Sequence, residues 1–420
     1  MAKRDDNKVL SVLHPICCGL DVHKDLVAAC LISTGEDGRE DYEQQVFSCF
    51  TDDLERMRGW LIERGCRVVA MESTGVYWHA VFDILEEGFK LFVVNARHIK
   101  NVPGRKTDVL DSQWLAGLLR HGLVRGSFIP PKEVRRWRDL ARCRRTYVES
   151  LADEKRRVHK LFQSANIKID SVVCDLFGVT GRNLMAVLSR RQKRLKLADV
   201  EDCLRGSLRK KGHELYRSVQ GFLDDGHRFI LKSHMSIIKS LEAQIKAIDR
   251  RLAKLLKPHY EVIERMTEVP GISLVSSYGI ISEIGPSLEA FPSAAHLCSW
   301  AGVCPGNNES AGKRRSGRSP VRRSHLKTLL IEAAWAAVKK KGSYYRNKFY
   351  SLRSRRGPKR AIMAIAHRLL KAIYAIVKQG AVYKELGENY LALQKKESRL
   401  SYLRVQAKQV GHKLVPIESI

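Results

Sequence analysis

Short apolar runs in the first 130 residues alternate with helix-like segments, and their order limits the fold more than any other feature of the chain. Five strands are predicted, at residues 16–22, 26–32, 46–50, 67–71 and 91–94. Helical spacing predicts three helices, at 52–64, 76–85 and 108–120. Strands that alternate with helices require crossover connections, so the order βββαβαβα predicts a mixed α/β sheet.

The middle of the chain, from about residue 134 to 258, has a predominantly helical pattern. Its clearest stretch runs from Ile238 to Leu255, where apolar residues recur with spacings of 3-4-3-4-3. This spacing is typical of a coiled-coil hairpin or a dimer contact, and a core helix of a bundle produces the same pattern. Residues 174–226 are irregular and receive no assignment.

The last part of the chain is also predicted to be helical. Residues 269–279 and 282–285 indicate two short helices around glycine turns, a helix-hairpin-helix arrangement whose helix N-termini can meet phosphates. A basic loop rich in Gly, Pro, Asn and Ser follows at 305–320, and helices are predicted at about 325–339 and 360–378. We therefore expect five segments: a tail at 1–14, an α/β domain at 15–131, a helical or coiled-coil region at 132–260, a second domain at 261–380 and a tail at 381–420.

Charge is distributed very unevenly along the 420 residues. The net charge is +30, yet residues 1–125 have 16 Lys and Arg against 19 Asp and Glu. Residues 301–420 have 27 Lys and Arg against 6 Asp and Glu, and the stretch 313–360 contains 17 basic residues and one acid, Glu332. A positive field of this size attracts a polyanion, so nucleic acid is the expected partner.

Other features of the composition exclude several classes of protein. An apolar run of about 18 residues, which a membrane-spanning helix requires, is missing, and no apolar segment follows the charged N-terminus as in a secretory signal. The ten cysteines include no C-x-x-C pair, so we expect reduced thiols in a cytoplasmic protein without membrane association.

Four acids in the first 125 residues are candidates for a metal site. Asp21 lies within a predicted strand, on the same face as Cys17 and Gly19, and Glu72 follows another strand. Asp108 and Asp111 are three residues apart at a predicted helix start, where they could also simply cap the helix. An acid in an apolar strand is costly unless it is paired or holds a metal, and carboxylates are the ligands of Mg²⁺ ions that act on phosphodiesters.

Three motifs in this region resemble the signature segments of a family of insertion-sequence transposases. They are Gly19-Leu-Asp-Val-His-Lys24, Met71-Glu-Ser-Thr-Gly-Val-Tyr-Trp78 and Arg105-Lys-Thr-Asp-Val-Leu-Asp111. The later segments Val269-Pro-Gly-Ile272 and Trp300-Ala-Gly-Val-Cys-Pro-Gly-Asn-Asn-Glu-Ser-Ala-Gly-Lys313 resemble the C-terminal domain of the same family. About 250 residues lie in matching blocks, and the central helical stretch matches only in character.

The resemblance implies a RuvC-like (RNase H) fold for the N-terminal domain and an α-helical C-terminal transposase domain. It implies that an acidic DEDD tetrad binds Mg²⁺ and that a serine forms a covalent phosphoserine with DNA. It also implies a structured noncoding bridge RNA that pairs with donor and target DNA. Residue by residue, the tetrad maps to Asp21, Glu72, Asp108 and Asp111, and the nucleophile maps to Ser310.

The residues around Ser310 suit a nucleophile of this kind. A serine hydroxyl is weak at neutral pH and needs a base, a metal or a dense positive field at the phosphate. Basic side chains are expected to contact nucleic acid near both candidate sites. They are Arg97, Lys100, Arg105 and Lys106 near the acids, and Lys313, Arg314, Arg315, Arg318, Arg322 and Arg323 after the serine.

We therefore expect an RNA-guided recombinase that works as a dimer or tetramer joined through the central helices. Two other interpretations stay open. One is a RuvC-like nuclease or resolvase that hydrolyses DNA by metal ions alone, and the other is a nucleic-acid-binding protein without catalytic activity.

Overall fold

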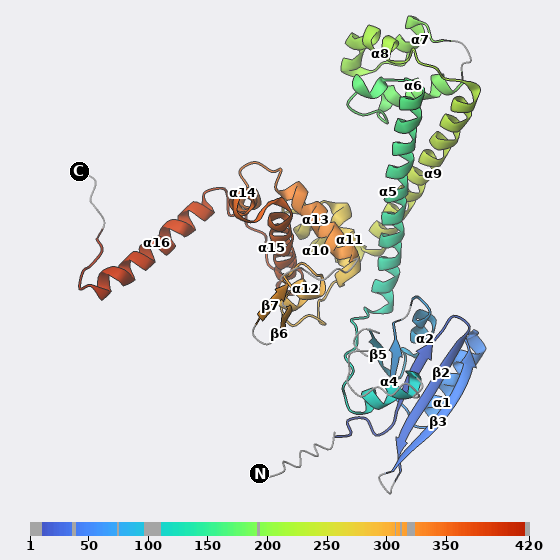
Figure 1. Ribbon diagram of the computed structural model, residues 1–420, viewed down its shortest axis with the longest axis vertical. Coiled ribbons are helices and arrows are strands. Elements are labelled where there is room, and N and C mark those ends of the chain that lie inside the picture. Colours follow the sequence, from blue (N-terminus) through green and yellow to red (C-terminus); the bar gives the residue numbers. More distant parts are fainter. Residues whose placement is uncertain are drawn as a thin grey trace. The chain divides into compact units, whose positions relative to one another are not determined.

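The computed structural model describes residues 11–35, 39–73, 75–95, 111–190, 194–306, 308–310, 313–316 and 324–415. The chain divides into two compact units, Met1–Lys132 and Glu133–Ile420. Figure 1 shows the elements of both.

The first unit is built on a five-stranded sheet in the order β3-β2-β1-β4-β5. Its strands are β1 (Cys17–Val22), β2 (Leu26–Thr34), β3 (Glu40–Ser48), β4 (Val68–Glu72) and β5 (Lys90–Val94). The first three strands pair antiparallel, whereas β4 is parallel to both β1 and β5. The described residues of this unit also form the helices α1 (Thr51–Glu63), α2 (Trp78–Leu85) and α4 (Asp111–Arg120), and the predicted order of elements is confirmed.

Side chains alternate between the two faces of the sheet, so each face has its own buried cluster. Leu20 of β1 and Met71 of β4 belong to a cluster with Leu54 of α1 and Val81 of α2. Residues of the opposite face, such as Ala70, pack with the apolar side of α4 (Leu115, Leu118 and Leu119). Side chains in a strand point alternately to the two faces, so odd-numbered positions of β1 face α4.

Strand β3 begins six residues before the predicted start at 46. The reason is that its first half, Glu40–Gln45, is polar and mostly exposed, as expected for a strand at the edge of a sheet. An apolar run marks only the end of this strand, where Phe47 is buried.

Two long helices dominate the beginning of the second unit, α5 (Lys132–Ser164) and α9 (Asp225–Leu255). Ion pairs join Glu154 to His234 and Arg144 to Asp249, so the two helices run antiparallel, as Figure 1 also shows. The predicted seam belongs to this hairpin: Ile238 and Leu252 are buried, whereas the seam residues between them are half-buried.

The unassigned residues 174–226 belong to a small helical domain between α5 and α9. Its helices are α6 (Val179–Arg190), α7 (Leu197–Glu201) and α8 (Gly212–Ser218), with short 3₁₀ turns at Ile169–Ser171 and Gly206–Lys211. A common core includes Phe162 of α5, Leu184 of α6, Leu215 of α8 and Leu231 of α9.

The C-terminal part of the second unit is a bundle around α15. Its helices are α10 (Tyr260–Thr267), α11 (Leu274–Ile284), α12 (Ala294–Trp300), α13 (His325–Ala337), α14 (Tyr344–Arg356) and α15 (Pro358–Gln379), followed by α16 (Tyr390–Gln409). Gly271 permits a tight crossing here, because a Cβ on it would lie 2.2 Å from the carbonyl oxygen of Ala333 in α13. Its φ of +85° also favours glycine.

Several predicted boundaries in this part are wrong. Gly279 does not separate two helices, since α11 continues through it, and the helical hairpin consists of α10 and α11 around Gly271. The predicted loop at 305–320 contains a two-stranded sheet, β6 (Asn308–Ser310) and β7 (Lys313–Ser316). Helix α14 was not predicted because its tyrosines and cations form no clear apolar stripe, and the expected tail at 381–420 includes α16.

None of the helices in the described ranges has the length and apolar character needed to cross a membrane.

Candidate acidic site and serine hairpin

Asp21 and Glu72 lie next to each other on paired strands. Leu20 of β1 pairs with Met71 of β4. Asp21 directly follows Leu20, and Glu72 directly follows Met71. Because β1 and β4 are parallel, both acids lie at the carboxyl ends of their strands, and alternation places both on the face covered by α4. Both residues are partly exposed, and 26% of the Asp21 side chain is accessible.

Gly19 lets α4 cross this face at very close range. A Cβ on Gly19 would lie 2.2 Å from the carbonyl oxygen of Ser112 and 2.6 Å from the amide nitrogen of Ala116. The thiol of Cys17 donates to the carbonyl oxygen of Ala116 over 3.6 Å. Residues of β1 that are closer to Asp21 therefore lie closer to the N-terminus of α4, whose first residue is Asp111.

The structure thus brings two of the four predicted acids together on one sheet face. Asp21 and Glu72 are neighbours, Asp111 begins the helix that covers them, and Asp108 lies outside the described residues. No group of three or more His, Cys, Asp and Glu side chains in the described part of the chain is close enough to hold a metal ion. The donor chemistry nevertheless fits Mg²⁺, since carboxylate oxygens are hard ligands at an accessible strand end.

His23 contacts Asp21 directly, a role that its position in a turn did not reveal. The imidazole Nε2 lies 3.0 Å from Oδ2 of Asp21, and 61% of the His23 side chain is exposed. A hydrogen bond of this kind fixes the orientation of a carboxylate, as do the residues that hydrogen-bond to metal ligands in other proteins. In the sequence, the only indication of this contact was that His23 lies two residues after Asp21.

Ser310 ends a strand of a β-hairpin. It pairs with Lys313, and Glu309 pairs with Arg314. The prediction that Ser310 lies in a loop is therefore corrected: Ser310 is the last residue of β6, and its backbone lies beside that of Lys313, the first residue of β7. Arg315 is part of β7.

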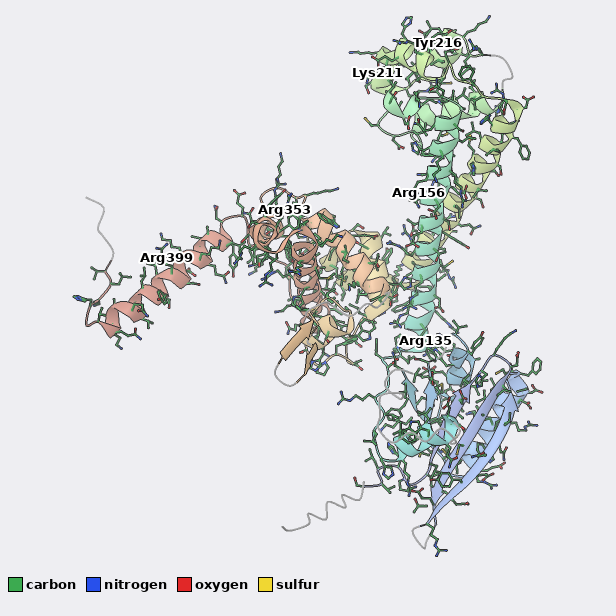
Figure 2. The ribbon with its side chains drawn as sticks, in the orientation of Figure 1. Arg135, Arg156, Lys211, Tyr216, Arg353 and Arg399 are labelled. Atoms are coloured by element: carbon green, nitrogen blue, oxygen red, sulfur yellow. The ribbon has the colours of Figure 1, made fainter. Side chains whose placement is uncertain are left out.

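Most of the other predicted nucleic-acid contacts lie outside the described residues. They are Arg97, Lys100, Arg105, Lys106, Arg318, Arg322 and Arg323. Further cations are spread over the second unit, where Figure 2 shows Arg156 on α5, Lys211 in the small helical domain, Arg353 on α14 and Arg399 on α16.

A cavity of about 790 Å³ in the second unit is lined by α5, α11 and α13. Its charged groups are mutually paired: buried Glu283 accepts from Arg142 at 2.8 and 3.0 Å and lies 3.3 Å from Arg138. Arg145 contacts Glu332 at 2.7 Å. Burial lowers the pKa of Arg138 to about 10, so its charge persists at neutral pH. These pairs connect α5 to the C-terminal helices and are best explained as structural.

Both units match models of transposase domains. A DEDD transposase domain of IS110 type matches residues 18–167, which include the sheet and its acids. A second model, described as transposase of the IS116/IS110/IS902 family, matches residues 263–351, which include the hairpin with Ser310. Two transposase domain models thus match the chain, one after the other, in the order that the sequence motifs indicated.

Two curated proteins are similar to the chain, at nearly the same sequence identity. Transposase y4pF/y4sB of Sinorhizobium fredii is 24% identical over 157 residues, which cover 36% of this chain and 40% of that protein. The 43.6 kDa protein of insertion element IS110 from Streptomyces coelicolor is 23% identical over 159 residues, 37% of this chain and 38% of that protein. The chain thus spans about 40% of the length of the relatives it matches.

Proposed function

We propose that the chain is a transposase that cuts and rejoins DNA in the cytoplasm, with an acidic metal site and a serine nucleophile. The observation that carries the proposal is the placement of Asp21 beside Glu72 on the sheet face where α4 begins with Asp111. Both matching domains are named as transposase domains, which supports the reaction class.

We further propose that the N-terminal domain has the RuvC-like (RNase H) fold. Its sheet order of 3-2-1-4-5, with three antiparallel strands followed by two parallel ones, supports this assignment. In such a sheet, the central first strand supplies Asp21 and its parallel neighbour supplies Glu72, so two carboxylates meet without any long loop.

In this proposal Asp21, Glu72, Asp108 and Asp111 hold Mg²⁺ ions. When bound, they would polarise the scissile phosphate and stabilise the oxygen that leaves. Ser310 Oγ attacks the phosphorus and loses its proton. The bond from phosphorus to the departing strand end breaks, and that oxygen takes up a proton. The strand then stays attached to Ser310 as a phosphodiester until a second strand end displaces the serine.

The cations after Ser310 serve the same step electrostatically. The pairing of Ser310 with Lys313 and of Glu309 with Arg314 holds the backbone of basic residues next to that of the serine. A positive field at this place offsets the charge that builds on the phosphate during attack. We propose that donor and target DNA bind here and that a noncoding bridge RNA selects them; the net positive charge of residues 301–420 supports a polyanionic partner.

Denaturing electrophoresis of the full chain with labelled DNA tests the serine. The wild-type chain is expected to form a protein–DNA adduct that survives denaturation, and Ser310→Ala is expected to lose both adduct and recombination. Ser316→Ala is the matched control, because Ser316 lies in the same hairpin opposite Asn308. If Ser310→Ala still cuts DNA and the wild type never forms an adduct, hydrolysis by metal ions alone replaces the proposal.

Metal binding is tested separately with Mn²⁺, whose paramagnetic signal counts bound ions without any reaction. Asp21→Asn is expected to weaken Mn²⁺ binding and abolish cleavage, whereas Asp25→Asn, in the exposed turn after β1, is expected to leave both unchanged. Equal Mn²⁺ binding by the two variants would remove Asp21 from the metal site. RNA that copurifies with the chain, identified by sequencing, tests the guide.

A further inference from the structure

A second cavity, of about 380 Å³, lies in the second unit between α14, α15 and the start of α16. Tyrosine rings form much of its wall: Tyr344, Tyr345, Tyr383 and Tyr390. Tyr344 and Tyr345 are buried, whereas Tyr383 and Tyr390 are only partly buried and leave ring surface accessible. These tyrosines are separated by up to 46 positions in sequence, so their convergence is a property of the fold.

The rings are held in place by contacts with one another. Tyr344 meets Tyr390 edge to face with ring centres 5.7 Å apart. Tyr345 and Tyr383 are nearly parallel, at 12°, with ring centres 6.5 Å apart. An aromatic surface that is already ordered costs little entropy when a ligand stacks on it.

Four cations share this wall: Lys348, Arg368, Lys371 and Lys384. The guanidinium of Arg368 lies 5.8 Å from the centre of the Tyr344 ring. Burial and then the neighbouring charges, Arg368 first among them, lower the pKa of Lys348. The part of this lowering of the pKa that comes from Arg368, Arg355 and Lys395 reflects a positive potential, which an anion in the cavity would reduce.

No acid is among the described residues that line this cavity. The carboxylate of Glu385, which contacts two of the tyrosines, already has hydrogen-bond partners. It accepts from the amide of Tyr344 at 2.9 Å, from the amide of Gly387 at 3.2 Å and from the hydroxyl of Tyr383 at 3.1 Å. The cations are therefore available for a ligand with negative charge.

We propose that this cavity binds an unpaired nucleotide of a single-stranded nucleic acid. Its base would stack on the accessible rings of Tyr383 and Tyr390, and its phosphates would contact Lys371 and Lys384. Aromatic platforms combined with cations are the usual means of holding single strands. The volume suits one small ligand, and a duplex hides the faces of its bases within the stack.

The aromatic wall favours a nucleotide over an acidic peptide, which would use the cations but gain little from four rings. The site is separate from the acids and from Ser310, and it requires no cleavage. It would bind a strand, either RNA or DNA, that is unpaired while the reaction proceeds. The RNA and DNA probes described below distinguish these two possibilities.

Binding is measured by fluorescence anisotropy with the full chain and short labelled strands. The strands are oligothymidylate and oligouridylate of about eight nucleotides, so that nucleotides on both sides of the bound base can also contact the protein. Tyr383→Leu is expected to weaken binding roughly 5- to 100-fold, the range for loss of one base-stacking contact. Tyr383→Phe keeps the ring and is expected to bind like the wild type. Lys384→Glu changes an exposed residue and is expected to flatten the salt dependence, since each lost phosphate contact removes about 0.7 from the slope.

Matched controls lie on α16, outside the cavity. Tyr402 and Lys396 are exposed, and Tyr402→Leu and Lys396→Glu are expected to leave binding unchanged. Strands that carry 5-iodouridine or its deoxy form are expected to crosslink under ultraviolet light to the peptide that contains Tyr383 or Tyr390. A strand with an abasic centre is expected to lose affinity, because its phosphates remain but its base does not.

Three results would overturn the proposal: wild-type affinity in Tyr383→Leu, equal affinity for the abasic strand, or crosslinks that map only to other peptides. Preference for one of the two oligonucleotides assigns the strand as RNA or DNA. Ser310→Ala and Asp21→Asn are expected to bind both probes normally, so failure of the proposed reaction and failure of this site give different results.

Discussion

Replacement of Gly19 by alanine tests the link between the fold and the acidic site. The added Cβ would lie 2.2 Å from the carbonyl oxygen of Ser112, where ordinary contact begins near 3.4 Å. Both nearest atoms belong to the backbone of α4, so no side chain can rotate away. The helix therefore has to move by about 1 Å, and we expect a loss of roughly 1–3 kcal/mol in the free energy of unfolding.

The same displacement carries Asp111 away from Asp21 and Glu72. A misplacement of about 1 Å in a catalytic arrangement can reduce the rate roughly 100-fold, so cleavage is expected to fall further than the change in stability explains. Hydrogen–deuterium exchange of peptides from β1 and α4 measures the local loss of stability in the full chain. Labelled DNA measures cleavage under conditions where the variant is still folded.

Gly117→Ala is the matched control, because Gly117 lies in the same helix and a Cβ there meets nothing within 4 Å. Alanine is a better helix former, so this variant is expected to be as stable as the wild type or up to about 1 kcal/mol more stable. If Gly19→Ala exchanged and cleaved like the wild type, α4 would not define the geometry of the acids.

The remaining predictions concern the second unit. Glu283→Gln leaves Arg138 buried beside a neutral group and is expected to cost about 3–5 kcal/mol in urea unfolding, whereas Glu332→Gln breaks a more exposed pair and should cost under about 1 kcal/mol. Burial, and then Lys371 and Arg368, lower the pKa of His367. The unfolded chain therefore binds this proton at higher pH than the folded chain, and stability should decrease as the pH falls from about 6.5 through the lowered value. His367→Asn should remove that part of the pH dependence, and NMR titration of the imidazole should give a pKa below 6.5; an ordinary value would contradict the argument.

The sequence predicted the sheet well because its strands are local apolar runs. The face shared by Cys17, Gly19 and Asp21 followed from alternation, and the contacts of Cys17 and Gly19 with α4 confirm it. The register that places Asp21 beside Glu72 joins residues about 50 positions apart, and no local pattern encodes it. The tyrosine cavity also joins residues far apart in the sequence, so no local pattern predicted it.

Predictions from the sequence were least accurate where polar residues form regular structure. The first half of β3 lacks an apolar pattern because it forms a sheet edge, and α14 exposes several of its arginines. The hairpin of β6 and β7 is rich in residues typical of loops, yet Ser310 and Lys313 pair across it. Strand pairing is made by backbone hydrogen bonds, and composition does not report these bonds.

The distribution of acids explains why the proposed reaction needs both units. Five acidic side chains of the second unit are engaged by arginine or histidine in pairs that join one helix to another: Glu154, Glu242, Asp249, Glu283 and Glu332. Such pairs join helices, and each carboxylate that they neutralise cannot also ligate a metal without giving up its partner. In the proposed reaction these five acids are therefore structural, and the partly exposed carboxylates of Asp21 and Glu72 at the strand ends of the first unit are the ones proposed to hold the metal. In the proposed reaction the phosphate needs both the metal that the acids of the first unit would hold and the serine that the second unit supplies, so Asp21→Asn and Ser310→Ala are each expected to abolish recombination.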